Sequence, residues 1–176
     1  AIAERHGRKF GLMCNSGTSA LLIALAALKE RHGWQEGDEV LVPAVSFVAT
    51  SNVVLFNQLK PVFVDVERDY YNIDPSPIEE KITARTRAIM PVHLGGLPCD
   101  MDPIMEIARN HGVKVIEDVS HAHGCIYKGK MTGAIGDVGA MSMMAGKSFA
   151  IGEAGMIVTD DREILERAMA FGHYER

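Results

Sequence analysis

The segment RAIMPVHLGGLPCDMDPIMEIARNHGVKVIED (residues 87–118) decides the fold class. Its apolar run at residues 87–92 predicts a buried strand, residues 102–111 predict a helix, and residues 113–117 predict a second buried strand. A helix of this length between two strands is the crossover that parallel neighbours require. The segment therefore predicts a unit of parallel β-sheet.

The sequence on the N-terminal side of this segment repeats the same alternation. Strands are predicted at residues 39–43 (EVLVP) and 61–65 (PVFVD). Helices are predicted at residues 1–8, from the polar turn at 15–18 to about residue 32, and at 47–57 and 76–82. Strands separated by helices of this length indicate an α/β fold, a mostly parallel sheet covered by helices on both faces.

The rhythm changes on the C-terminal side. Shorter extended pieces are predicted at residues 124–127, 139–143 and 155–159, followed by a helix at about 162–171. Short strands joined without helices do not form parallel pairs, so the complete sheet is expected to be mixed.

Composition limits the possible partners and the location. A chain of 176 residues, 47% of them hydrophobic, can form one domain with a substantial core. The formal net charge of −5 is spread along the chain without a basic block, so no nucleic-acid or anionic-membrane surface is indicated. The longest apolar runs, at residues 20–28 and 40–45, are far shorter than the roughly 20 residues of a membrane-spanning helix.

The cysteines favour a reducing compartment. Cys14, Cys99 and Cys125 are odd in number and scattered, unlike a disulfide framework, so a cytoplasmic protein is expected. The chain opens without methionine inside a helix-like segment and stops at Arg176 soon after another. We therefore expect it to be part of a larger protein.

The turn NSGTS (residues 15–19) is the first candidate for a binding role. Gly17 allows the backbone to approach a ligand, and the helix that follows offers free N–H groups and the positive end of its dipole, which suit a phosphate. An ordinary helix cap explains the same residues, since such caps are common.

Glu117 and Asp118 form the second candidate, because ligands of open α/β sheets collect at the carboxyl ends of strands. A carboxylate there would suit a buried cationic ring nitrogen, with which it forms a charge-assisted hydrogen bond. A carboxylate that caps the next turn is the alternative.

The third candidate is Lys147 in the segment SMMAGK (residues 142–147). Lysine is normally exposed, so its place between apolar strands, in a region punctuated by Gly146 and by GEAG (152–155), favours use as a nucleophile. A solvated loop lysine is the alternative.

A metal site is a competing interpretation of HAHGC (residues 121–125). In an extended conformation His121, His123 and Cys125 would lie on one face and resemble metal ligands. No second ligand pair occurs at the spacing of structural zinc, so no metal is expected.

Taken in order, the motifs resemble the DegT/DnrJ/EryC1/StrS family of sugar aminotransferases. The motifs that carry this resemblance are NSGTSA (15–20), VPAVSFVAT (42–50), PVFVD (61–65), IMPVH (89–93), VIED (115–118), Ser142 with Lys147, and GEAG (152–155). Each is weak alone, but seven in the right order are strong. The resemblance implies a fold-type-I transferase that uses pyridoxal 5′-phosphate (PLP).

The resemblance also implies a role for individual residues. Lys147 lies at the position of the Schiff-base lysine, and Asp118 at that of the carboxylate paired with the pyridine nitrogen. Thr18, Ser19 and Ser142 match phosphate-binding positions. Phe47 matches an aromatic residue that covers one face of the ring. His121 matches a position near the 3-oxygen of the ring, which makes it the third expected catalytic residue beside Lys147 and Asp118.

The chain departs from the family pattern near the lysine. Met141 and Met143 flank Ser142 where the family often has an aromatic residue, and Ala154 replaces a usual glycine. Some members of the family dehydrate sugars and have histidine in place of the lysine. Lys147 argues against that activity.

The activity implied is transfer of an amino group from an amino acid, expected to be glutamate, to a nucleotide-linked keto-sugar by a ping-pong Schiff-base mechanism. Residues 1–176 would then be an incomplete large domain, without the early N-terminal segment and the C-terminal small domain of a homodimeric enzyme. A non-catalytic fragment is the alternative. The sequence has neither the G-x-G-x-x-G turn of a dinucleotide-binding oxidoreductase nor the G-x-S-x-G elbow of a hydrolase.

Overall fold

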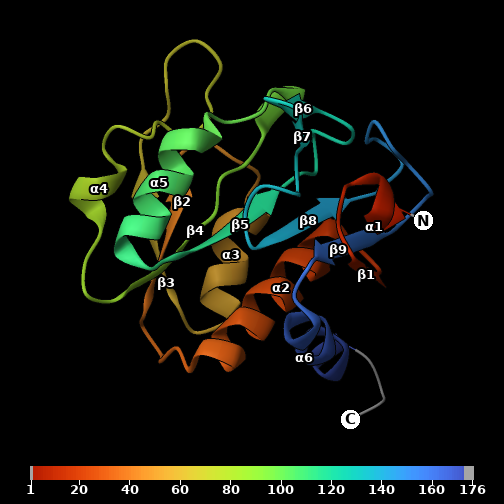
Figure 1. The fold of residues 1–176 in the computed structure, drawn as a ribbon, viewed down its shortest axis with the longest axis horizontal. Helices are drawn as coiled ribbons and strands as arrows, with labels where there is room; N and C mark the ends of the chain where they lie inside the picture. Colours follow the sequence, from red (N-terminus) through yellow and green to blue (C-terminus); the bar gives the residue numbers. More distant parts are fainter. Residues whose placement is uncertain (1, 173–176) are drawn as a thin grey trace.

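Seven strands form one sheet in a computed structural model that describes residues 2–172 (Figure 1). Their order across the sheet is β1-β9-β8-β5-β4-β2-β3. Their bounds are β1 (Phe10–Cys14), β2 (Glu39–Pro43), β3 (Lys60–Val64), β4 (Thr86–Ile89), β5 (Lys114–Asp118), β8 (Val138–Ser142) and β9 (Gly155–Thr159). Only β9 runs antiparallel to its neighbours, so the expected α/β class with a mixed, mostly parallel sheet is confirmed.

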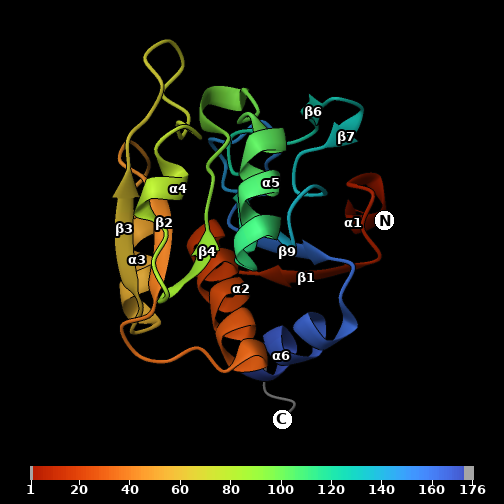
Figure 2. The same cartoon turned by 60° about the vertical axis from the view of Figure 1, so that its left-hand side comes forward.

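Helices cover both faces of this sheet. One core joins α2 (Gly17–His32), α3 (Ala49–Phe56) and α6 (Arg162–Gly172) to side chains such as Val40 and Val42 of β2. Leu41, between those two valines, instead packs in a second core under α4 (Ile78–Lys81) and α5 (Met101–His111). Figure 2 shows α4 and α5 together on their side of the sheet. Alternate residues of β2 thus face opposite layers, as the pleat requires.

A third apolar cluster lies beside α1 (Ile2–Arg5), the short helix observed within the predicted segment 1–8. Residue 1 lies outside the described residues. Ala3 of this helix packs with methionines of β8 and β9 and of the loop between them, among them Met141, Met143 and Met156. The methionines that flank Ser142 are therefore part of the core.

The extended piece predicted at residues 124–127 is only partly a strand, and it lies outside the large sheet. Only Ile126–Tyr127 (β6) is a strand, and it pairs with β7 (Lys130–Met131) in a separate hairpin. Lys128 and Gly129, between the two strands, both have positive φ, the conformation of a tight hairpin turn. This local turn closes the hairpin before the segment can join the large sheet.

The sequence also failed to indicate β1. The side chains of this strand are alternately half-buried and exposed, and it pairs only with β9, at one edge of the sheet. An edge strand buries too little of its surface to produce a marked apolar run. Helix α4 is one turn, shorter than the predicted 76–82, and α3 begins at Ala49, two residues later than expected. No described helix is long and apolar enough to cross a membrane.

Candidate active site

A cavity of about 280 Å³ lies where the carboxyl ends of β2, β4, β5 and β8 meet the N-terminus of α2. Its walls come from five separate stretches of the chain. They are formed by Ser16, Gly17, Thr18, Leu21, Ser46, Phe47, Ala49, Val92, Leu94, Asp118, Ser120, His121, Ser142, Met144, Lys147 and Glu153. All the residues to which the resemblance assigns a role, except Ser19, line this one cavity.

The N-terminus of α2 forms one end of the cavity. Ser16 is the N-cap, and its Oγ accepts a hydrogen bond from the backbone N–H of Ser19 at 3.1 Å. The helix itself provides no acceptor for the N–H groups of Gly17 and Thr18 in its first turn. Ser19 does not line the cavity, because its hydroxyl is directed to the Oγ of Ser16, 3.0 Å away. The turn is therefore both a helix cap and a wall of the cavity.

Gly17 permits the close approach of α2 to β8. A Cβ atom at this position would lie only 2.5 Å from the Cβ of Ser142, a separation that real side chains do not reach. The absence of a side chain places the Ser142 hydroxyl beside the helix N-terminus. Two hydroxyls, those of Thr18 and Ser142, thus line the cavity near N–H groups that lack an intrahelical acceptor, a set of donors that suits a phosphate.

Asp118 ends β5 and is 5% exposed. Its Oδ1 accepts the backbone N–H of Ser120 at 3.0 Å, and Ser120 Oγ in turn accepts the N–H of Ser142 at 3.1 Å. Within residues 2–172, Asp118 forms no ion pair with lysine or arginine. The carboxylate is therefore held by the local turn and lines a cavity without a cationic partner of its own. Glu117, its neighbour, does not line the cavity.

Lys147 lies in the loop that joins β8 to β9. This loop is held by backbone hydrogen bonds from Met143 N–H to Ala154 O at 2.7 Å and from Lys147 N–H to Met144 O at 2.9 Å. The half-buried side chain lines the same cavity as Asp118. An amine from the β8–β9 loop and a carboxylate from the end of β5 therefore face one small space.

His121 lines the cavity from the loop after β5. Its Nδ1 accepts the N–H of Gly95 at 3.3 Å, which leaves Nε2 as the protonated ring nitrogen. Burial and the cationic Lys147 lower the pKa of His121, while the nearby Asp118 acts in the opposite direction. The imidazole is therefore a neutral hydrogen-bond donor at pH 7.

Phe47 follows β2 and lines the outer side of the cavity with 68% of its surface exposed. Met144, also exposed, lines the same cavity. One wall of the cavity is thus apolar and open.

The metal interpretation finds no geometric support. Among the described residues, no three histidine, cysteine or acidic side chains converge on a possible ion. Cys125 donates its S–H to the carbonyl oxygen of Gly96, and the ring of His123 packs beside Phe149 with the ring centroids 6.3 Å apart. The three side chains of HAHGC are therefore engaged separately.

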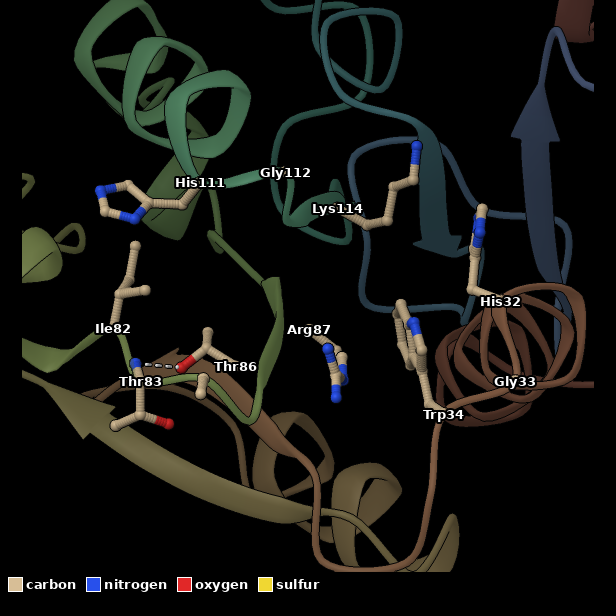
Figure 3. Close-up of a pocket in the computed structure, with 11 residues that line it drawn as sticks. His32, Gly33, Trp34, Ile82, Thr83, Thr86, Arg87, His111, Gly112 and Lys114 are labelled. Atoms are coloured by element: carbon tan, nitrogen blue, oxygen red, sulfur yellow. Dashed lines mark hydrogen bonds between the residues drawn. The ribbon is translucent and has the colours of Figure 1, made fainter.

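A larger cavity, of about 640 Å³, lies at the opposite end of the strands (Figure 3). Arg87, His111 and Lys114 line it, and each is paired with a carboxylate: Asp38, Glu79 and Asp137, at 2.8, 2.9 and 3.0 Å. The cavity also lies at the C-terminal ends of α2 and α5, where cations balance the helix dipole. These groups already satisfy one another, so the smaller cavity remains the candidate site.

Sequence reasoning missed several residues of the candidate site. Ser46, Leu94, Ser120 and Glu153 line the cavity without having been predicted. Ser120 had a recognisable signal, since a serine two residues after an aspartate commonly binds that carboxylate through its backbone N–H. The other three reach the cavity only through the way their loops fold.

Comparisons with known proteins agree on one family. The model of the DegT/DnrJ/EryC1/StrS aminotransferase family matches residues 1–174. GDP-perosamine synthase of Caulobacter vibrioides is 44% identical over 164 residues, which are 93% of this chain and 43% of that protein. The chain thus spans less than half the length of this relative.

Two solved structures with the same fold are also similar to this chain in sequence. The aminotransferase from Psychrobacter cryohalolentis superposes with a TM-score of 0.91 at 40% identity, covering 96% of this chain and 42% of that one. A GDP-4-keto-6-deoxy-D-mannose-3-dehydratase from E. coli, solved with bound hydrated PLP, gives a TM-score of 0.87 at 35% identity, covering 92% and 42%.

Proposed function

The chain belongs to the DegT/DnrJ/EryC1/StrS aminotransferase family, and we propose that it forms the cofactor-binding part of a PLP-dependent sugar aminotransferase. The observation that carries this proposal is the meeting of Lys147, Asp118 and the N-terminus of α2 in one cavity. The three groups come from distant parts of the sequence, and each matches a different part of the cofactor.

The donors and acceptors of the cavity fit pyridoxal phosphate. The N–H groups of Gly17 and Thr18, with the hydroxyls of Thr18 and Ser142, suit the phosphate, and Ser19 belongs to the same turn. The unpaired carboxylate of Asp118 suits a protonated ring nitrogen. We assign Phe47 to one face of the ring and the Nε2–H of His121 to the ring's 3-oxygen.

The reactive residues have separate tasks in this proposal. Bound pyridoxal phosphate supplies an electron sink for the carbon from which a proton is removed. Lys147 Nζ would hold the cofactor at its aldehyde carbon, and the same amine would move the proton at the α-carbon of the amino donor. Asp118 keeps the ring nitrogen protonated, and the neutral His121 donates a hydrogen bond without adding charge.

We propose a nucleotide-linked keto-sugar as the amino acceptor and glutamate as the donor. The first part is supported by the relative in Caulobacter vibrioides, a GDP-perosamine synthase. Sugar dehydration is the nearest alternative, since one similar structure is a GDP-sugar dehydratase. Lys147 favours transamination, because the resemblance assigns histidine to that position in dehydrating members.

We further propose that the active enzyme is a longer cytoplasmic homodimer in which these residues form most of the large domain. The coverage of 43% of the Caulobacter vibrioides relative supports the greater length, and the exposed Phe47 and Met144 that line the cavity suit cover by a second subunit. The free thiols of Cys14, Cys99 and Cys125 suit a reducing compartment. Light scattering on the full-length protein tests the dimer.

Covalent labelling tests the function directly. The full-length protein is incubated with PLP, reduced with borohydride and digested, and the modified peptide is identified by mass spectrometry. We expect the label on Lys147, loss of label and of transamination in Lys147→Ala, and retention of both in Lys130→Ala, which changes an exposed lysine. A label on another lysine, or transamination by Lys147→Ala, contradicts the proposal.

A further inference from the structure

His93 and Glu117 form a fully buried pair behind the candidate site. Both side chains are 0% exposed, and His93 Nε2 lies 3.1 Å from Glu117 Oε2. The backbone N–H of Cys99 donates to His93 Nδ1 at 3.0 Å. Because Nδ1 accepts this bond, Nε2 carries a proton and donates a hydrogen bond to Glu117.

Glu117 also fixes the loop that precedes β8. Its two oxygens accept the backbone N–H groups of Gly133, Ile135 and Gly136 at 2.8, 2.8 and 2.7 Å. Burial raises the pKa of Glu117, but the hydrogen bonds from His93 and from the backbone outweigh it and lower the pKa overall. With four donors, the buried carboxylate is ionised and fully hydrogen-bonded.

The same histidine holds the backbone of Asp118. The His93 N–H donates to the carbonyl oxygen of Asp118 at 3.1 Å, and the Asp118 N–H donates to Pro91 O at 2.9 Å. His93 is therefore bonded to two consecutive residues of β5, to Asp118 through its main chain and to Glu117 through its ring. Rotation of the Asp118 backbone would break bonds at both points.

The contacts of His93 with Glu117 and Asp118 lie where the pairing of β4 with β5 ends. The regular register of the two strands stops at Ile89 and Val115, and only an isolated bridge between Val92 and Asp118 continues it. A buried ionic group stabilises a fold no better than apolar residues of similar volume, and its best-attested use is to fix a register. The ladder with β8 holds Asp118 on one side, where it pairs with Ala140, but on the β4 side the regular ladder ends before Asp118 and His93 supplies the contact.

We propose that His93 and Glu117 are positioning residues that hold the Asp118 carboxylate in the cavity, acting through the backbone of β5. The inference rests on the proposed function, since it assigns Asp118 to the cofactor. Neither residue lines the cavity. In metal sites, mutation of a residue that orients a ligand lowers metal affinity or activity roughly 10–100-fold. We expect an effect at the lower end of that range for His93 and Glu117.

Three variants of the full-length protein separate positioning from stability. His93→Leu removes the donor, whereas His93→Gln keeps an amide N–H that reaches Glu117. Ile104→Ala truncates a fully buried side chain of α5 that does not line the cavity and is the control for lost stability. If His93→Leu does not fold, His93→Asn, whose shorter amide cannot reach Glu117, replaces it. The readouts are PLP affinity, the visible circular dichroism of bound PLP, and kcat and KM for the amino donor.

We expect His93→Leu to lower kcat about 10-fold, to weaken PLP binding and to alter the circular dichroism, with KM for the donor unchanged. His93→Gln should restore all three, and Ile104→Ala should alter none at a temperature where it is folded. A His93→Leu protein with the dichroism and kcat of Ile104→Ala would overturn the inference. Failure of the unsubstituted protein to bind PLP at Lys147 would instead overturn the proposed function.

Discussion

At the scale of single residues, the proposed cofactor site depends most on the charge of the Asp118 side chain. It is buried, accepts only a backbone hydrogen bond from Ser120 among the described residues, and shares its cavity with Lys147. A carboxylate placed in this way is costly to bury unless a cation completes the site. The proposed cofactor provides that cation at its ring nitrogen.

We predict that Asp118→Asn lowers kcat of the full-length enzyme by roughly 100-fold or more, the scale at which a preorganised electrostatic partner acts. The isosteric amide keeps the volume but cannot stabilise a protonated ring nitrogen. Steady-state kinetics measure the effect. Asp137→Asn changes a half-exposed carboxylate paired with Lys114 and serves as the control. Equal activity of the two variants would contradict the assigned role.

His121 gives a prediction for pH. Its pKa lies below the ordinary value of 6.5 because of burial and Lys147, so half of the imidazole should be protonated only at a pH below that value. We expect Lys147→Ala to raise the pKa of His121 and Asp118→Asn to lower it, since each removes one of the two opposing charges. NMR titration of the imidazole in the cofactor-free, full-length protein measures the shifts. A midpoint above 6.5 would be incompatible with this environment.

At the scale of elements, the contact between α2 and β8 shapes the end of the cavity assigned to the phosphate. The N-terminus of α2 and the end of β8 approach so closely that a side chain at Gly17 would collide with Ser142. The contact also positions the Ser142 hydroxyl, which belongs to the strand and not to the helix. The proposed phosphate site therefore depends on a packing distance between two elements.

We predict that Gly17→Ala destabilises the fold by about 1–3 kcal/mol, the usual cost of adding an atom to a well-packed contact. PLP affinity should fall as well, because the strand end must move away from the helix. Chemical unfolding and cofactor titration measure the two effects. Thr18→Ser keeps a hydroxyl and adds no atom, so it should change neither. Unchanged PLP binding in Gly17→Ala would show that the contact has no role in the site.

At the scale of the whole molecule, Arg8 ties the N-terminal residues to distant parts of the fold. It is 8% exposed, and its Nε donates to Gly133 O at 2.8 Å while its Nη1 pairs with Asp160 at 3.0 Å. Gly133 belongs to the loop that Glu117 fixes, and Asp160 follows β9. One guanidinium thus connects the region of α1 to both sides of the β8–β9 pair.

We predict that Arg8→Met lowers the free energy of unfolding by about 2–3 kcal/mol, because hydrogen bonds to charged groups are lost and buried acceptors remain. Arg162→Met removes a matched ion pair with Glu166 whose side chains are 80% and 59% exposed, and it should cost under about 1 kcal/mol. Urea unfolding compares the two. Similar losses of unfolding free energy in the two variants would mean that the buried hydrogen bonds of Arg8 stabilise the fold no more than an exposed ion pair does.

The sequence by itself determined the fold class and the family, and it pointed to the residues that are proposed to react. Strand and helix patterns are local, so the alternation through residues 39–118 was readable from the order of apolar residues, and Lys147 and Asp118 were recognisable from the motifs around them. The ends of helices and strands and the edge strand β1 were harder to predict, because they bury little apolar surface.

Only the tertiary structure decided which of these residues meet. The resemblance pointed to Asp118, but periodicity alone could not tell whether Glu117 or Asp118 faces the cavity, since alternation places them on opposite faces without saying which face holds it. Strand order puts β8 beside β5, which brings Lys147 and Ser142 to Asp118, and the same packing turns Glu117 toward His93. These contacts join residues far apart in the chain, and the local periodicity of apolar residues does not predict which distant residues pair.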